Sequence, residues 1–321
     1  MQNTNSVVVV LGTGGTIAGT AAAGAPDSSY RAAQLGVAEL LAAVPSLLPP
    51  IECEQVAQLD SKDMGFAVWM ALAERLRHHL GRPEVAGVVV THGTDTLEET
   101  AYFLHRVLAP FKPVVLTAAM RPATSVEADG PRNLHDAVTV ARHPEAQGVV
   151  AVVAGQVFAA ADVRKVHPTR LNAFGAGEAG ALANVSAQGL RQLRPWTQEP
   201  VTQSVIPWTD TARWPRVALV FSHAGADGAL VRALTATPAD GSPPVQGLVV
   251  ACTGNGSLHH ALEAALLEAQ AAGVCVWRST QCTEGEVVPR PTDHFASTGR
   301  LTPVKARIAL MLDLMAHPLN A

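Results

Sequence analysis

Short apolar runs alternate along the chain with longer segments of helical periodicity. The apolar runs are rich in β-branched residues, which is typical of strands buried on both faces of a parallel sheet. We expect strands at residues 7–11, 88–91, 114–117, 149–153, 217–221, 248–252 and 274–277. Helical periodicity covers about residues 37–44, 64–80, 96–108, 258–271 and 302–315, and one more helix is expected after residues 129–131 (DGP). This order of elements predicts an α/β fold of repeated βα units.

The alternation stops between residues 191 and 214, where prolines gather with three of the five tryptophans, Trp196, Trp208 and Trp214. Such a segment is typical of a connector that packs on a surface rather than of a loose linker. A length of 321 residues also favours two domains over one. We predict a larger N-terminal domain with a doubly wound, mainly parallel sheet (1–190), a connector (191–214) and a smaller C-terminal α/β domain (215–321).

Composition narrows the classes of function. The formal net charge of −4 disfavours nucleic acid as a partner, because nucleic-acid-binding proteins present a basic face. No apolar run approaches the roughly 20 residues of a membrane-spanning helix, so no membrane partner is expected. The four cysteines lack C-x-x-C spacing and the histidines lack an H-E-x-x-H pattern, so we expect no metal and no cofactor. The lack of a signal-peptide pattern predicts a reduced, cytoplasmic protein, with the mature chain of an exported precursor as the alternative.

A glycine-rich segment, residues 12–19, follows the first predicted strand. A dinucleotide-binding loop would need glycine at position 17, where the chain has Ile17, and no Gly-Lys-Ser/Thr sequence follows. The loop instead holds Thr16 near backbone N–H groups that could stabilise either an oxyanion or a phosphate. Ligands of open α/β sheets bind beyond the carboxyl ends of the strands, so Thr16 is a candidate for chemistry.

A second polar segment, residues 92–96 (HGTDT), follows the strand predicted at 88–91. Thr96 and Glu99 have the spacing of a helix capping box, in which the two side chains satisfy backbone N–H groups of the first turn. That interpretation leaves Thr94 and Asp95 available for function.

A threonine hydroxyl is a weak nucleophile and needs a neighbouring base. His92 is either such a base or the partner in a structural hydrogen bond. Lys165, one of only four lysines in the chain, follows the strand predicted at 149–153, from where it could reach the same crevice. It is either a base, if its surroundings favour the neutral amine, or a surface cation.

Two segments, residues 14–19 (GGTIAG) and 91–96 (THGTDT), resemble the signature motifs of the bacterial L-asparaginases. Further blocks resemble the type II, or glutaminase-asparaginase, branch of that family; they are residues 36–40, 61–64, 99–104, 119–122, 128–131, 254–256 and 304–307. The blocks span both predicted domains, so the resemblance covers most of the chain.

The resemblance implies an amidohydrolase that converts L-asparagine to L-aspartate and ammonia through a threonine acyl-enzyme, and it leaves L-glutaminase side activity open. It implies Thr16 as the nucleophile and Tyr30, one of two tyrosines, as the residue that helps to activate it. Thr94, Asp95 and Lys165 match the family's second triad, in which Thr94 places or activates the attacking water.

The resemblance also implies how the substrate is held. Asp95 matches the carboxylate that binds the α-amino group. Ser61, next to Asp60, matches the hydroxyl that meets the α-carboxylate. The backbone at Thr94 and Ala119 would complete the pocket. These features fit a zwitterionic substrate, which requires a fixed anion, donors for its carboxylate and an oxyanion hole.

The chain departs from the family's pattern at three places. Type II members often have Gln or Glu after the pocket serine, where this chain has Lys62. Ser257 stands where strict asparaginases often have a second asparagine, which leaves the preference between asparagine and glutamine open. The family's C-domain acid, which reaches a neighbouring subunit's pocket in a homotetramer, matches Glu286 in preference to Glu284, and the spacing to Phe295 indicates an insertion.

Overall fold

The computed structural model describes residues 6–22, 29–45, 47, 50–196, 209–239 and 241–318. The chain divides into two compact units, Met1–Ser204 and Val205–Ala321. The division falls inside the predicted connector, of which residues 197–208, with Trp208, lie outside the described residues. None of the helices in the described part of the chain is long and apolar enough to cross a membrane.

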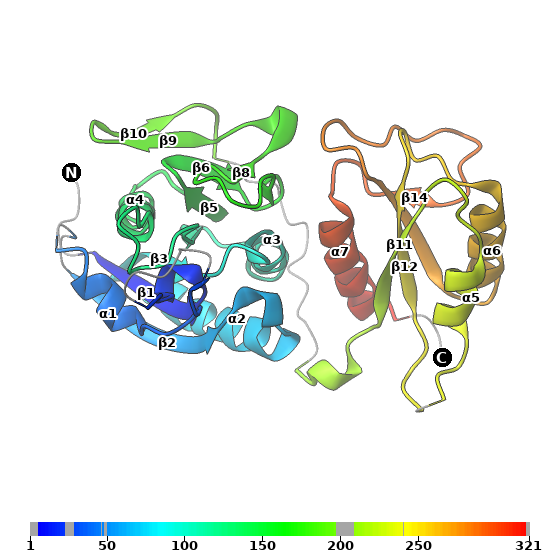
Figure 1. The fold of residues 1–321 in the computed structure, drawn as a ribbon, viewed down its shortest axis with the longest axis horizontal. Helices are drawn as coiled ribbons and strands as arrows, with labels where there is room; N and C mark the ends of the chain where they lie inside the picture. Colours follow the sequence, from blue (N-terminus) through cyan, green and yellow to red (C-terminus); the bar gives the residue numbers. More distant parts are fainter. Residues whose placement is uncertain are drawn as a thin grey trace. The chain divides into compact units, whose positions relative to one another are not determined.

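The first unit is built on an eight-stranded sheet in the order β10-β9-β6-β5-β4-β3-β1-β2 (Figure 1). Five strands run parallel: β1 (Val7–Gly14), β2 (Ile51–Leu59), β3 (Val85–Thr91), β4 (Val114–Thr117) and β5 (Val149–Val153). Three antiparallel strands extend the sheet: β6 (Gln156–Ala159), β9 (Ala183–Ser186) and β10 (Gly189–Gln192). A separate two-stranded sheet pairs β7 (Arg164–Lys165) with β8 (Phe174–Gly175). The predicted mainly parallel sheet is confirmed.

Helices cover both faces of this sheet (Figure 1). On one face, α1 (Val37–Ala42) and α4 (Gly130–Ala141) pack on alternate side chains of the strands, in a shared apolar cluster. On the other face lie α2 (Phe66–Leu80) and α3 (Leu97–Leu108), which contact each other. The valines of β3, β4 and β5 are therefore buried from both sides, as expected for a doubly wound sheet.

Strand β2 is absent from the sequence prediction because it lies at the edge of the sheet, where polar side chains interrupt the apolar pattern. Its place beside β1 gives the order β2-β1-β3-β4-β5, so the strand order reverses between β1 and β3. In sheets of this kind the ligand crevice lies at that reversal, beyond the carboxyl ends of the strands. Helix α2 begins two residues later than expected, because residues 61–64 form a tight 3-10 turn.

The second unit has a four-stranded parallel sheet of β11 (Val217–Phe221), β12 (Gly247–Cys252), β13 (Cys275–Thr280) and β14 (Ala296–Ser297). Helices α5 (Ala229–Thr235) and α6 (His260–Ala271) share one apolar cluster with the strands, and α7 (Pro303–Ala316) contributes to another. The smaller α/β unit is confirmed, although the short elements α5 and β14 are absent from the prediction. The described part of the chain includes the 3-10 helices η1 (Thr16–Ala18), η3 (Ser61–Asp63), η4 (Gly177–Ala179) and η5 (Thr211–Arg213).

Candidate active site

The loops that follow β1 and β3 touch at the point where the strand order reverses. Gly15, directly after β1, has a φ of 83°, which glycine adopts readily and L side chains rarely adopt. A Cβ on Gly15 would overlap the backbone of Gly93 after β3, and a Cβ on Gly93 would overlap the side chain of Ser61. Three loops are therefore in close contact here, and they bring the segments of Thr16, Thr94 and Ser61 together.

Thr16 and Tyr30 are in hydrogen-bond contact. Thr16 begins η1, is 7% exposed, and has its hydroxyl 2.8 Å from the hydroxyl of Tyr30. Tyr30 is held by an antiparallel bridge between Thr20 and Arg31, whose two N–H groups each donate to the other residue's carbonyl over 2.9 Å. The tyrosine ring lies so close to Gly19 that a Cβ there would be 2.8 Å from its Cδ2. A proton can thus pass directly between the two hydroxyl oxygens.

Lys165 joins Thr94 and Asp95. Its Nζ donates to Thr94 Oγ1 over 2.9 Å and to Asp95 Oδ1 over 2.6 Å. Strand β7 places the lysine there, and its backbone N–H lies 3.4 Å from Glu98 Oε1 in the first turn of α3. Thr94 is 6% exposed, whereas the Asp95 side chain is 53% exposed and so remains accessible to a ligand.

Ser61 contributes a hydroxyl beside this triad. Its Oγ accepts the N–H of Asp95 over 3.2 Å, so its own hydrogen can be donated to a ligand carboxylate. Asp60 caps η3 by accepting the N–H of Lys62, and the Lys62 ammonium donates to the same carboxylate over 2.6 Å. The hydrogen bond to Asp60 raises the pKa of Lys62 and keeps it charged.

The predicted capping box at Thr96 and Glu99 is wrong. Thr96 is the N-cap residue of α3, but its side chain does not cap the helix. Its hydroxyl instead donates to the carbonyl of Ser61 over 2.7 Å. Thr96 therefore ties the start of α3 to the loop that carries Ser61, which local sequence spacing does not reveal.

His92 lies in a buried chain of hydrogen bonds behind the triad. The indole Nε1–H of Trp69 donates to Thr100 Oγ1 over 2.9 Å, and Thr100 Oγ1 lies 2.9 Å from His92 Nε2. His92 Nδ1 lies 2.7 Å from the carbonyl of Gly93. Burial lowers the pKa of His92 to about 4, against the opposing effect of the bond to Gly93. The structural interpretation of His92 therefore fits better than that of a base.

Two further residues, Asp129 and Asn133, hold the backbone after β4. The Asp129 carboxylate accepts the N–H groups of Met120 and Arg121 over 2.9–3.1 Å. Asn133 is 1% exposed, and its Nδ2 donates to the carbonyl of Ala118 over 2.8 Å and to Asp129 Oδ2 over 3.1 Å. The sequence marks Asp129 as the start of a helix, and no local signal in it points to a connection with Ala119.

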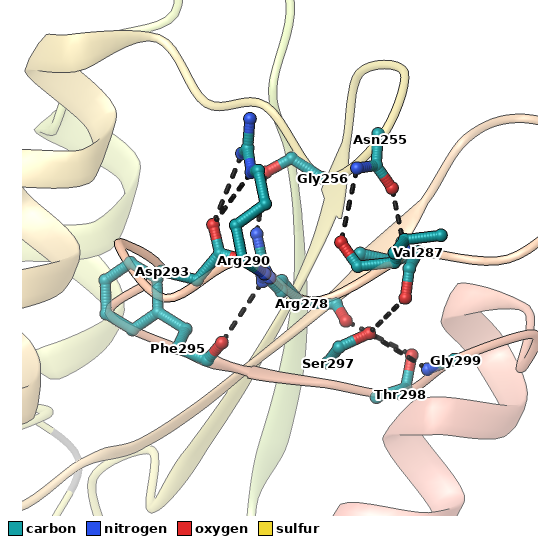
Figure 2. A network of polar contacts seen from close by, with 11 residues as sticks. Asn255, Gly256, Arg278, Val287, Arg290, Asp293, Phe295, Ser297, Thr298 and Gly299 are labelled. Carbon is teal, nitrogen blue, oxygen red and sulfur yellow. Dashed lines mark hydrogen bonds and ion pairs between the residues drawn. The ribbon is translucent and has the colours of Figure 1, made fainter.

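Glu286 lies in the second unit. Figure 2 shows the polar contacts around its neighbour Val287. Its neighbour Val287 is 1% exposed, donates to the carbonyl of Gly299 and accepts the hydroxyl of Ser297 over 3.1 Å. A Cβ on Gly299 would lie 4.0 Å from Oε2 of the Glu286 carboxylate.

The side-chain amide of Asn255 bonds to both backbone groups of Val288: Nδ2 donates to the carbonyl over 3.2 Å, and Oδ1 accepts the N–H over 2.7 Å (Figure 2). Behind it, the buried Arg278 pairs with Asp293 and donates to the carbonyls of Gly256 and Phe295. The segment around Glu286 therefore has a fixed backbone within its own unit.

The structure thus brings together the predicted residues of the first unit. Glu286 belongs to the second unit. Among the described residues, no three His, Cys, Asp or Glu side chains are grouped so that they could hold a metal ion. The site offers the Thr16–Tyr30 hydroxyl pair, the hydroxyls of Thr94 and Ser61, an ammonium, a carboxylate and backbone groups, which suit acyl transfer to a hydroxyl.

Comparisons with known proteins agree over nearly the whole chain. The family model described as "Asparaginase, N-terminal" matches residues 7–198, and the one described as "Glutaminase/Asparaginase C-terminal domain" matches residues 216–318. The chain is 36% identical to L-asparaginase 2 of Bacillus subtilis, over 95% of this chain and 81% of the relative. It is 34% identical to a glutaminase-asparaginase of Acinetobacter glutaminasificans, over 96% and 94%.

A crystal structure described as a probable cytoplasmic L-asparaginase from Campylobacter jejuni superposes with a TM-score of 0.87 at 32% identity, and the match covers 98% of this chain and 96% of that one. Both units and their order along the chain are therefore shared with known proteins. The chain belongs to the asparaginase family.

Proposed function

We propose that this chain is an L-asparagine amidohydrolase, which hydrolyses the side-chain amide to L-aspartate and ammonia. The observation that carries the proposal is the joint placement of two partnered threonines, with Thr16 bonded to Tyr30 and Thr94 bonded to Lys165. A double displacement uses two such hydroxyls, one to form the acyl-enzyme and one to guide the water that breaks it. Relatives named L-asparaginase and glutaminase-asparaginase support the hydrolysis of asparagine.

In the first step, Thr16 Oγ attacks the amide carbonyl carbon. The Thr16 proton passes to the Tyr30 oxygen, and the Tyr30 proton passes to the leaving nitrogen, so ammonia departs as the C–N bond breaks. The new C–O bond joins the aspartyl group to Thr16. The negative charge that develops on the carbonyl oxygen is stabilised by backbone N–H groups of the loops after β1 and β3.

In the second step, water attacks the ester carbon and the bond from that carbon to Thr16 Oγ breaks. One water proton returns through the Tyr30 hydroxyl to Thr16 Oγ, and L-aspartate leaves. Lys165 donates to Thr94 Oγ1, so the hydroxyl hydrogen of Thr94 is directed to another acceptor, such as the water oxygen. The lysine charge also stabilises the anion that forms when water attacks. Asp95 balances that charge from 2.6 Å.

The substrate's charged groups meet complementary partners. The accessible carboxylate of Asp95 accepts the α-ammonium group, and the Ser61 hydroxyl donates to the α-carboxylate. The neighbouring Lys62 ammonium donates to Asp60 over 2.6 Å. The carbonyl of Ala119 is an acceptor for the N–H groups of the side-chain amide.

We propose that the N-terminal unit is catalytic and that the C-terminal unit completes a neighbouring subunit's site through Glu286, in a homotetramer. The fixed backbone around Val287 supports Glu286 over Glu284 for that role, because it limits the positions that the carboxylate can reach. Light scattering tests the oligomer, and a monomer with full activity at nanomolar concentration would refute the shared site.

We also propose a reduced, cytoplasmic location. All four cysteines are free thiols in the structure, as is common in reducing compartments. Cell fractionation with antibodies against the chain tests this, and recovery in the periplasm would refute it.

A coupled ammonia assay with L-asparagine and L-glutamine at low concentration tests the activity. We expect faster ammonia release from asparagine. Thr16→Ala and Thr94→Val should each abolish turnover and leave the circular dichroism spectrum unchanged. Thr139→Val is the matched control, because the Thr139 hydroxyl bonds within its own helix, to the carbonyl of His135 over 3.0 Å. Ammonia release by Thr16→Ala at the wild-type rate would contradict the assignment of the nucleophile.

A further inference from the structure

Asp129 and Asn133 form hydrogen bonds with two consecutive peptide groups directly after β4. Asn133 Nδ2 holds the carbonyl oxygen of Ala118 over 2.8 Å. The Asp129 carboxylate holds the N–H of Met120, which belongs to the peptide group that follows Ala119, with both oxygens at 3.0–3.1 Å. Ala119 is thus fixed on each side by a side chain of the same helix turn.

The geometry of the peptide group gives the direction of the Ala119 carbonyl. The peptide bond is planar and trans, so its C=O and N–H point in opposite directions. Since the N–H of Met120 points to Asp129, the Ala119 carbonyl points away from Asp129. The alternation of carbonyls along the chain agrees: Thr117 O accepts from His92 N after β3, and Ala118 O faces Asn133. The Ala119 carbonyl therefore returns to the side of β3, where Thr94 follows.

The Asn133 side chain lies in the core of the first unit. Asn133 is 1% exposed, and its Oδ1 accepts the N–H of Ala154 over 3.0 Å, so the same side chain also ties down the end of β5. A Cβ on Gly130, at the start of α4, would lie 2.9 Å from Ile17 and 3.5 Å from Ala119. The turn between Asp129 and Asn133 therefore packs directly beside the segment that contains Thr16.

We propose that Asn133 and Asp129 are positioning residues that aim the Ala119 carbonyl at the N–H groups of the substrate's side-chain amide. This inference rests on the proposed function and deepens it: the hydrogen bonds from Asp129 and Asn133 make the site selective for amides over esters. A primary amide has N–H donors that require an acceptor, whereas an ester has none at that position. The chain itself shows this type of bond in its second unit, where the Asn255 side-chain amide donates to the carbonyl of Val288 over 3.2 Å (Figure 2).

The test compares L-asparagine with the β-methyl ester of L-aspartate. Both substrates form the same acyl-enzyme, so kcat/KM reports binding and the steps up to the departure of ammonia or methanol, and it excludes the shared hydrolysis of the acyl-enzyme. Asn133→Ala removes the bond to Ala118, and Asn133→Asp keeps the size of the side chain but replaces its donors with acceptors. We expect each variant to lower kcat/KM for the amide about ten-fold or more, with the ester value within about three-fold of wild type, which corresponds to one misaligned hydrogen bond.

Asp129→Asn keeps the volume of the side chain and provides a second route if Asn133→Ala fails to fold; the same selective loss is expected. Asp136→Asn is the matched control, because Asp136 is fully buried on the same helix but bonds to Arg132, at 2.9 Å. Its amide-to-ester ratio should equal that of wild type.

Three results are informative. A selective loss of amide turnover supports the positioning role. Equal losses for amide and ester, or no loss in any folded variant, would overturn it while the proposed amidohydrolase function stands. If the wild-type protein hydrolyses neither substrate, the proposed function itself fails, and the inference fails with it.

Discussion

The buried hydrogen-bond chain at His92 predicts a specific sensitivity to acid. Trp69 Nε1 can only donate, so Thr100 accepts from it and gives its own hydrogen to His92 Nε2. This leaves Nδ1–H to donate to the carbonyl of Gly93. Protonation would place a second N–H against the Thr100 hydroxyl and put a charge in a fully buried position, so the folded protein favours neutral histidine.

The magnitude follows from the shift in the pKa. In the unfolded chain His92 has its ordinary pKa of 6.5, and burial lowers the folded value to about 4. The unfolded state therefore binds more protons between these values, and stability falls as the pH falls from 6.5 through 4. The shift corresponds to a total loss of about 3 kcal/mol, of which roughly 2 kcal/mol is lost between pH 7 and pH 5.

His92→Gln isolates this contribution, because glutamine provides a donor and an acceptor that do not titrate. We expect the variant to be less stable than wild type at neutral pH, since it disrupts a buried hydrogen-bond chain. The gap should shrink by roughly 2 kcal/mol at pH 5, where the wild type alone loses the histidine contribution.

Urea unfolding of the full chain at several pH values, followed by tryptophan fluorescence, measures both free energies. Trp69 in the hydrogen-bond chain contributes to this signal. If wild type and His92→Gln lose the same stability between pH 7 and pH 5, the assignment of a neutral, buried His92 is wrong.

Two further predictions concern the second unit and the cysteines. Arg278→Met should lower the thermal midpoint more than Arg290→Met, because both arginines pair with Asp293 but their side chains are 3% and 50% exposed (Figure 2); equal shifts in calorimetry would contradict this. Cys252 should resist iodoacetamide at mildly alkaline pH while the exposed Cys53 is alkylated, because burial raises the pKa of the Cys252 thiol to about 12. Peptide mass spectrometry measures both sites, and equal labelling of the folded protein would refute the prediction.

The periodic pattern of apolar residues was enough to predict the fold class. A strand buried on both faces requires a continuous apolar run, and the runs at β1, β3, β4 and β5 are nearly pure valine and leucine. Strand β2 was not predicted, because an edge strand is half exposed and tolerates charged residues that interrupt the apolar pattern. Without β2, the reversal of strand order between β1 and β3 could not be located.

The sequence by itself also determined which residue types were available for chemistry. Glycine loops after two strands and the scarcity of lysine and tyrosine reduced the candidates to a few, and the family resemblance assigned their expected roles. These are local properties, since a motif and its spacing can be identified along the chain.

Only the tertiary structure decided which partners those residues have. Thr96 has the spacing of a cap but bonds to Ser61, and Asn133 lies 15 positions from Ala118 yet holds its carbonyl. His92 could be a base or a structural residue in the sequence, and its hydrogen-bond partners together with complete burial favour the second. Hydrogen bonds between distant segments form wherever folding brings donor and acceptor within about 3 Å. That distance is a property of the packed chain, and no local sequence pattern encodes it.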